Sequence, residues 1–412
     1  FNLEQHQGAG GRDARERISH YLLRHHQGHT RVPHAYSWLA TWKVNRRSRS
    51  LLDHVDYPNR EYIQRWYPED DDGDFFEMDD RFTFNDSGTQ IAHRDARWLY
   101  PPYRRLREHL TPDDPEKYRF FFNPRMKRRL DDWTHVVDTA VVFDPRHTQD
   151  EVFDDIIEDY IDMEAFLRVW AIRINIDDWD SWGVGRGKNA YFYRPAIDGR
   201  WTMIAWDMEL TYEFQGRFMP PAIESSYNTI DAAKFREVFR LTNRPRFKRM
   251  FYGILWEMLD RPFNPNFLAP YVALLDDTPV TRTDVGKPGG HIDIRGQRVR
   301  NTIEAAAFPL RRLEITTNGG EPLSADEPMI TIEGQAPVDA LRILLHVEGQ
   351  PEDTTVEATF SNSDYFSWSA EVPLALGENV VHAMGMTSRD EVLDADSIEV
   401  VVGTSGGEFV RG

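Results

Sequence analysis

The sequence predicts an α+β protein followed by a small all-β domain. Apolar residues with helical periodicity dominate residues 90–174 and return over residues 231–270. After Pro309, short alternating apolar runs are separated by Gly, Pro, Asn and Asp turns at intervals of about ten residues. We therefore expect a mixed domain, an immunoglobulin-like β-sandwich and a short tail. Their predicted bounds are 1–308, 309–403 and 404–412.

The first part of the chain predicts one helix and one hairpin. Asp13 and Glu16 have the spacing of a capping box, and an apolar stripe continues the predicted helix over residues 14–26. Residues 38–44 are apolar, aromatic and β-branched, which predicts a strand. Residues 50–55 are its expected hairpin partner, joined through a polar stretch.

Further helices are predicted in the middle of the chain. Residues 153–160 carry one apolar stripe, and Asp162 is placed to cap a second helix that ends near Ile174. A last helix is expected near residues 294–307, after a loop rich in Gly and Pro.

An acidic run covers residues 69–80, where eight of twelve residues are Asp or Glu. A calcium loop needs oxygen ligands at positions 1, 3 and 5 and Gly at position 6. Counting from Asp70, Gly73 falls at position 4, so that template fails. A solvated acidic loop is the preferred interpretation.

Composition excludes several function classes. A formal net charge of −19 at pH 7 disfavours nucleic-acid binding. The absence of Cys excludes disulfides, thiolate zinc sites and Cys nucleophiles. No apolar run reaches the roughly 18 residues of a membrane span. The chain begins at Phe1 in what resembles the middle of a domain, so a preceding signal peptide and the compartment stay open.

The chemistry is concentrated around one predicted hairpin. The segments AYFYR and RWTMIAW are strand-like and flank Asp198-Gly199, a favourable turn dipeptide. Asn189 precedes the first strand, and Asp207 and Glu209 follow the second. Carboxylates with an amide oxygen suit a hard divalent cation, and this donor set with phosphate oxygens is the usual Mg²⁺ arrangement.

The register of this hairpin decides whether the three oxygen groups meet. A two-residue turn at Asp198-Gly199 sets Asn189 opposite Met208. A three-residue loop over 198–200 sets Asn189 opposite Glu209, with Asp207 on the same face. The metal hypothesis therefore predicts the second register.

Two further Asp residues precede the hairpin. Asp178 and Asp180 lie among Trp side chains at the end of the predicted helix. A carboxylate there is suited to accept the proton of an attacking hydroxyl. Both Asp178 and Asp180 are candidates for that role, with a cap or supporting role as the alternative for Asp178. Turn and cap chemistry at strand ends is the alternative explanation for all of these residues.

These motifs resemble those of the CotH (spore coat protein H-like) atypical protein kinases. The resemblance is carried by the aromatic Asp turn, by Asn189 before an aromatic strand, and above all by the segment IAWDMEL. It extends to the segments GAGGRDARERISHYLLR and IDMEAFLRVWAI and covers roughly residues 1–310. It implies an atypical protein-kinase fold that transfers phosphate from ATP to a protein hydroxyl. It also implies that Asp180 is the catalytic Asp and that Asn189 and Asp207 bind the metal.

The sequence departs from the family pattern in three places. Glu209 stands where the family usually has Asp. The glycine-containing hairpin of the family is replaced by Val44-Asn45-Arg46-Arg47, and a following Glu by Asp53. The strands that carry the family's phosphate-contacting Lys are not recognisable and are expected to lie before this chain begins. Glu16 is the candidate partner of that Lys.

Two functions follow as hypotheses. The first is a metal-dependent phosphotransferase that uses ATP and Mg²⁺ or Mn²⁺ on a protein Ser or Thr, with Asn189, Asp207 and Glu209 as metal ligands. Transfer of AMP by the same site is a variant of it. The second is a catalytically inactive envelope or adhesion protein with a relic fold. A bacterial extracytoplasmic or cell-surface location is expected for both, with a protein substrate for the first, while the nucleotide-binding residues are unknown.

Overall fold

The computed structural model describes most of the chain in two compact units. The described residues are 2–4, 13–98, 116–119, 121–212, 236–305, 312–351 and 354–403. Unit 1 comprises residues 1–242 and 258–302, and unit 2 comprises residues 243–257 and 303–412. The predicted tail, 404–412, lies outside the described residues.

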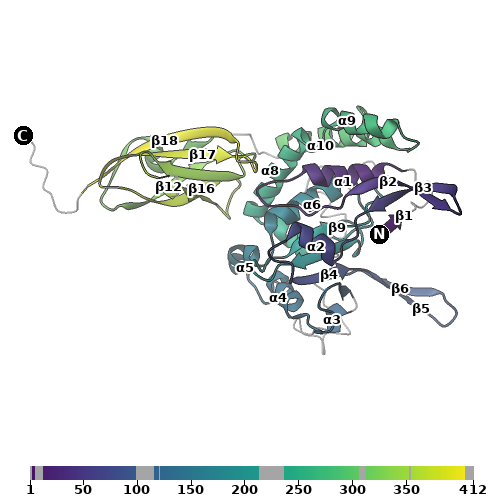
Figure 1. Cartoon of the computed structure of the whole chain (residues 1–412). Coiled ribbons are helices and arrows are strands. Elements are labelled where there is room, and N and C mark those ends of the chain that lie inside the picture. The colour runs from purple at the N-terminus through teal and green to yellow at the C-terminus, as the bar shows by residue number, and fades with distance from the viewer. Residues whose placement is uncertain are drawn as a thin grey trace, which may run out of the picture. The chain divides into compact units, whose positions relative to one another are not determined.

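Unit 1 mixes helices with three small sheets (Figure 1). Its helices are α1 (Arg15–His25), α2 (Arg60–Trp66), α3 (Glu116–Arg119), α4 (Thr134–Phe143), α5 (Asp150–Ile156), α6 (Met163–Asn175), α7 (Arg236–Asn243), α9 (Pro265–Asp276) and α10 (His291–Ala305). Its strands are β1 (Asn2–Glu4), β2 (Ser37–Val44), β3 (Arg47–Val55), β4 (Asp74–Met78), β5 (Arg81–Phe84), β6 (Gln90–Arg94), β7 (Phe122–Pro124), β8 (Ala190–Arg194) and β9 (Thr202–Ala205). Helix α8 (Pro245–Asp260) contributes residues to both units, and the last residues of α7 and α10 also fall in unit 2.

A four-stranded antiparallel sheet in the order β7-β4-β8-β9 supports the segments discussed below. Its strands are rich in aromatic residues, which suit a pleated surface that is buried. Phe76 of β4 pairs with Phe192 of β8, and both side chains are buried. Helix α6 packs against β9 and α1, so the chain that leaves α6 emerges beside this sheet.

The first hairpin forms a separate sheet in the order β1-β3-β2. Its turn contains only Asn45 and Arg46, both with positive φ, as a two-residue type I′ turn requires. The turn is thus shorter than the predicted polar connection, because β3 already begins at Arg47.

Within the described residues, β5 and β6 form a two-stranded sheet of their own, and this hairpin extends from the body of the unit (Figure 1). Its two feet, at Asp80 and at Asp95, are buried although the tip is exposed. A hairpin of this kind brings residues on either side of it close together, whatever lies at its tip.

Unit 2 contains two sheets around one apolar core. The sheets have the orders β10-β12-β16-β15 and β11-β18-β17-β13-β14, and the core includes Ile332 and Trp368 from the first and Val381 from the second. The strands are β10 (Glu314–Ile315), β11 (Leu323–Ala325), β12 (Met329–Gln335), β13 (Arg342–Val347), β14 (Val356–Glu357), β15 (Thr359–Phe360), β16 (Ser367–Pro373), β17 (Gly377–Met386) and β18 (Val392–Val402).

The helical residues of unit 2 are held to its strands by a buried cation. Arg249 donates to the carbonyl oxygens of Pro337, at 2.5 Å, and Ala340, at 2.7 Å, and lies over the Phe360 ring. Burial lowers the pKa of Arg249 to about 9. The sequence patterns did not indicate that helical residues belong to this unit.

The structure confirms the α+β class and the β-rich C-terminal region. The predicted first helix and first hairpin are present. Asp162 caps α6, since its carboxylate accepts a hydrogen bond from the Ala165 N–H at 3.1 Å. The last helix is present but begins earlier, at His291.

Three predictions about local structure are wrong. The capping box is absent, because Ala14 occupies the N-cap position and the Asp13 carboxylate binds the Arg15 N–H instead. The acidic run is not wholly a loop, since β4 forms within it and buries Phe75 and Phe76. The region of helical periodicity contains two strands, β6 and β7.

Among the helices in the described part of the chain, none combines the length and apolar character needed to cross a membrane.

Candidate functional site

The β8–β9 hairpin forms as predicted, but both predicted registers are wrong. Ala190 pairs with Ala205 and Tyr193 with Thr202, so the connection runs from Pro195 to Trp201. Continuing this register places Asn189 level with Trp206, neither with Met208 nor with Glu209.

The longer connection has a local cause. Pro195 lacks an N–H and follows the last residue of β8, and its carbonyl accepts a hydrogen bond from the Gly199 N–H at 3.0 Å. Gly199 has a φ of +77°, which glycine adopts readily. The Asp70 carboxylate accepts hydrogen bonds from the N–H groups of Ala196 (2.8 Å) and Ile197 (2.9 Å). An acidic residue more than a hundred positions away therefore fixes the loop.

At the other end of the hairpin, the extended backbone ends near two candidate ligands, Asn189 and Asp207. Asn189 has a φ of +58° and Asp207 a φ of +53°, values that non-glycine residues rarely adopt. Such conformations cost free energy and concentrate at functional sites. The backbone here thus turns out of the sheet at the residues that were singled out in the sequence.

A buried guanidinium joins the two chain segments at this end. Arg173 of α6 donates to the Asn189 carbonyl at 2.7 Å and to the Trp206 carbonyl at 3.2 Å. It therefore fixes the backbone before β8 and the backbone that precedes Asp207. No pattern in the sequence indicated this role.

Asp178 neutralises that guanidinium. Its Oδ2 accepts a hydrogen bond from Arg173 Nε at 2.6 Å, and both side chains are fully buried. Burial raises the pKa of Asp178 to about 6, although the charge of Arg173 acts in the opposite direction. Asp178 is thus the buried ion-pair partner of Arg173.

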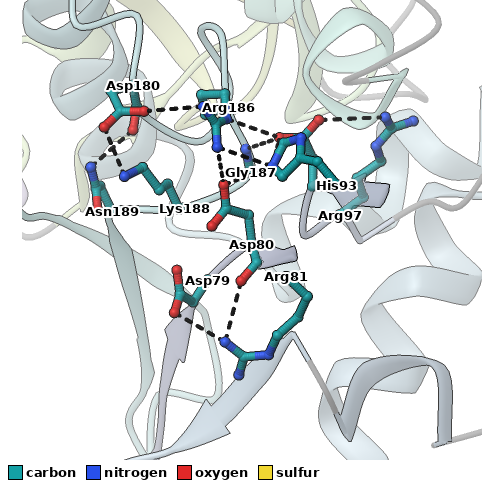
Figure 2. Close-up of polar contacts among 11 residues, drawn as sticks. Asp79, Asp80, Arg81, His93, Arg97, Asp180, Arg186, Gly187, Lys188 and Asn189 are labelled. Carbon is teal, nitrogen blue, oxygen red and sulfur yellow. Dashed lines mark hydrogen bonds and ion pairs between the residues drawn. The ribbon is translucent and has the colours of Figure 1, made fainter. Parts of the chain in front are cut away.

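Asp180 lies beside two cations and the first candidate ligand (Figure 2). Lys188 Nζ lies 2.8 Å from Asp180 Oδ2, and Arg186 lies 3.8 Å from Asp180 Oδ1. The Asn189 side-chain N–H donates to the backbone carbonyl of Asp180 at 2.9 Å. Asp180, Lys188 and Asn189 therefore form one contact group.

Lys188 also interacts electrostatically with the second candidate ligand, Asp207. Burial lowers the pKa of Lys188, but its hydrogen bond to Asp180 and the charges of Asp180, Asp207 and Asp80 outweigh that effect, so the net pKa is raised. The ammonium group is therefore protonated at neutral pH, and it interacts with the carboxylates of both Asp180 and Asp207.

Arg186 connects this group to the feet of the β5–β6 hairpin. Its guanidinium donates to the Asp80 carboxylate, and the same nitrogen lies 3.0 Å from His93 Nε2. The neighbouring Gly187 N–H donates to Asp95 at 2.8 Å. A Cβ atom at Gly187 would lie 2.2 Å from the Ala96 backbone nitrogen, so only glycine permits this approach.

The predicted site residues thus fall into two sets. Asp180 and Asn189 are in contact, and Asp207 lies close enough to influence Lys188. Glu209 is not opposite Asn189 in the ladder. It lies in the segment that leads to Tyr212, whose N–H donates to the Ile176 carbonyl at 2.6 Å. Sequence inspection missed Arg173, Arg186 and Lys188, although Lys188 directly precedes Asn189.

The family model described as CotH kinase protein matches residues 16–280, which is more than half of the chain. The chain belongs to the CotH kinase protein family. The resemblance seen in the sequence is thereby confirmed, and the matched region includes the whole β8–β9 hairpin and the Asp180 group of this CotH family member.

The other comparisons add little. No curated protein matches the chain. Among solved structures, the fibronectin(III)-like modules of Clostridium thermocellum CbhA are similar at 14% identity and a TM-score of 0.18, covering 22% of this chain and 96% of the module. A likeness at this TM-score supports no statement about fold or function.

Proposed function

We propose that this CotH family member is a metal-dependent phosphotransferase with an atypical protein-kinase fold. It transfers the γ-phosphate of ATP to a Ser or Thr hydroxyl of a protein. The observation that carries the proposal is the contact group at the end of the β8–β9 hairpin, where Asp180 meets Lys188 and Asn189. Kinase catalysis requires a carboxylate for the hydroxyl, cationic groups for phosphate, and oxygen ligands for the metal, and this group offers each.

Asp180 is proposed to orient the acceptor hydroxyl and to accept its proton. Its side chain is largely buried, with 9% exposed, which limits its contact with bulk water. The Lys188 ammonium, 2.8 Å from Asp180 Oδ2, forms an ion pair with the carboxylate and fixes its position. The same ammonium is placed to offset charge that develops on a transferred phosphoryl group.

Asn189 and Asp207 are the proposed ligands of Mg²⁺ or Mn²⁺, with Glu209 as a further candidate. The fit rests on their chemistry, an amide oxygen and carboxylates, and on the bond that the Asn189 amide N–H makes to Asp180. Since the amide N–H is the group that donates to the Asp180 carbonyl, the amide oxygen of Asn189 is the atom proposed to bind the cation. A bound divalent cation would neutralise the phosphates of ATP and orient them.

Arg173 is proposed as a positioning residue. It contacts the backbone of both candidate ligand segments through carbonyl groups. It would not touch ATP, because it is fully buried and paired with Asp178. Its task is to keep Asn189 and the segment before Asp207 at one distance, which preorganises a metal site.

The C-terminal unit is proposed to be an immunoglobulin-like spacer or adhesion module. Its two sheets around one core support a stable module of its own. A bacterial extracytoplasmic or cell-surface location completes the proposal, and the lack of Cys is compatible with it.

The proposal is tested by incubating the full chain with Mg²⁺ or Mn²⁺, γ-labelled ATP and a mixed protein substrate. We expect label on protein Ser or Thr, and loss of that label in Asp207→Ala. Asp198→Ala is the matched control, because it removes a carboxylate from the opposite end of the same hairpin.

Label that is equal in the parent and in Asp207→Ala, or absent from both, contradicts the proposal. The second of these results favours the inactive envelope or adhesion protein. A parallel reaction with α-labelled ATP separates phosphoryl transfer from AMP transfer, since only AMP transfer leaves that label on protein.

A further inference from the structure

A second group of potential metal ligands lies at the feet of the β5–β6 hairpin. Asp80 precedes β5, His93 lies in β6 and Asp95 follows it. One ligand atom from each lies within 4.8 Å of the other two, and the two carboxylates are buried. None of these residues is part of the proposed ATP site. Asp80 ends the acidic run, whereas no sequence pattern singled out His93 or Asp95.

The spacing of the ligand atoms is close to that of a coordination sphere. His93 Nε2 lies 2.8 Å from Asp80 Oδ2 and 3.8 Å from Asp95 Oδ1. Nitrogen and oxygen ligands at about 2.1 Å from a metal lie roughly 3.0–3.4 Å from one another. Small movements of side chains would therefore complete the geometry.

A cation already occupies part of this space. The Arg186 guanidinium contacts Asp80, and one of its terminal nitrogens lies 3.0 Å from His93 Nε2 (Figure 2). Its fit is incomplete, because Arg186 Nε is buried without a hydrogen-bond partner and lies 3.8 Å from Asp95 Oδ1. A buried donor without an acceptor costs free energy.

The two contacts of His93 Nε2 require opposite hydrogen-bonding roles. Toward the Asp80 carboxylate, its Nε2 must donate a proton, whereas toward the Arg186 N–H it must accept one. A metal ion removes this conflict, because it binds the Nε2 lone pair and both carboxylates at once. Two carboxylates and a neutral imidazole also carry a charge of −2, which a divalent cation neutralises and a guanidinium does not.

We propose that Asp80, His93 and Asp95 form a binding site for a divalent transition metal of the Zn²⁺ type, for which Arg186 competes. An imidazole nitrogen with two carboxylate oxygens is a donor set that Zn²⁺ accepts, and three protein ligands leave a position for water or an anion. Metal binding displaces Arg186 from the feet of the hairpin. The site is separate from the proposed Mg²⁺–ATP site and does not depend on phosphotransfer.

The test is calorimetric titration of the full, chelator-treated chain with Zn²⁺ in excess Mg²⁺ and without nucleotide. We expect one Zn²⁺ per chain at a site that His93→Ala weakens by at least about tenfold. Arg186→Gln should strengthen binding by about tenfold, because it removes the competing charge. Co²⁺ in place of Zn²⁺ gives visible absorption bands that report the ligand set.

Two controls make the result specific. Asp79→Asn changes a neighbouring carboxylate that pairs with Arg81, and it should leave Zn²⁺ affinity unchanged. Asp207→Ala should also leave it unchanged, which separates this site from the proposed ATP site. His93→Gln replaces His93→Ala if the alanine variant does not fold, because it keeps a polar side chain of similar length.

The proposal is overturned if neither the parent nor Arg186→Gln binds Zn²⁺ stoichiometrically. It is also overturned if His93→Ala and its glutamine counterpart bind as tightly as the parent. Loss of phosphotransfer alone has no bearing on it, since the readout is metal binding.

Discussion

The two ends of the β8–β9 hairpin both carry Asp side chains, and they differ in what those carboxylates contact. At the turn, Asp70 accepts backbone N–H groups, and Asp198 pairs with Arg200 at 40% side-chain exposure. At the opposite end, Asp178 and Asp180 are buried against Arg173 and Lys188.

This difference separates structural carboxylates from candidate functional ones. Backbone N–H groups that bind a partly exposed Asp stabilise a turn, and the exposed ion pair beside it contributes little. Burying ion pairs costs desolvation energy, and strained backbone at Asn189 and Asp207 adds to the cost. Buried ion pairs and strained backbone of this kind cluster at functional sites, which is why this end of the hairpin is the candidate site. The following predictions test the contrast, from the largest effect to the smallest.

Removing the buried cation should have the largest effect on stability. Arg173→Gln leaves the Asp178 carboxylate buried without a charge partner and removes bonds to two carbonyls. The free energy of unfolding should fall by about 3–5 kcal/mol. Arg200→Gln is the matched control at the turn and should cost about 1 kcal/mol or less. Denaturant unfolding of both variants measures the difference, and equal losses would refute the contrast.

Lowering the pH should destabilise unit 1, because His20 and His291 are buried in it. Burial lowers the pKa of His20 to about 3 and that of His291 to about 4, against 6.5 when unfolded. Both imidazoles are neutral in the folded protein. Their contribution to the free energy of unfolding is therefore complete above pH 6.5 and is lost as the pH falls from 6.5 toward 4. Asp178, with its pKa raised to about 6, opposes them over the same range but with a smaller shift. The melting temperature should therefore decline between pH 6.5 and 4.

The variant His291→Gln tests whether His291 causes this decline in melting temperature. The His291 imidazole contacts the Asn175 carbonyl at 3.0 Å, and the amide N–H of His291→Gln is able to make the same bond without titrating. The loss of melting temperature on acidification should be shallower in this variant by a few degrees. An unchanged pH profile would show that His291 does not govern it.

The smallest effect is expected at the turn. Asp70→Ala removes the acceptor for the N–H groups of Ala196 and Ile197, which solvent partly replaces. Stability should fall by about 1 kcal/mol, within the usual range for a lost cap. The rate of phosphotransfer should stay close to that of the parent. A loss as large as that of Arg173→Gln would show that the turn is as critical as the opposite end.

Local sequence patterns predicted many elements but not the hairpin register. The register depends on Pro195, which ends β8, and on Asp70, which binds the loop from a distant part of the chain. Strand β4 was not predicted, because its apolar residues lie within the acidic run 69–80. Its Phe75 and Phe76 are buried, and Phe76 pairs with Phe192 of a strand more than a hundred residues later.

The candidate site was predictable only in part, for a related reason. Asp180, Asn189 and Asp207 have residue types and an order that indicate their chemistry. Arg173 and Lys188 are indistinguishable in sequence from solvated cations, and only burial and pairing reveal them. The group of Asp80, His93 and Asp95 also depends on where the hairpin feet come together.

One paired measurement tests the central claim most directly. Initial rates of transfer from γ-labelled ATP are compared for Asp180→Asn and Asp198→Asn, which make the same chemical change at the two ends of one hairpin. We expect Asp180→Asn to lower the rate by at least about 100-fold, because the proposed acceptor of the hydroxyl proton is lost. Asp198→Asn should retain nearly the parent rate. Similar rates for the two variants would contradict the assignment of the Asp180 end as the working site.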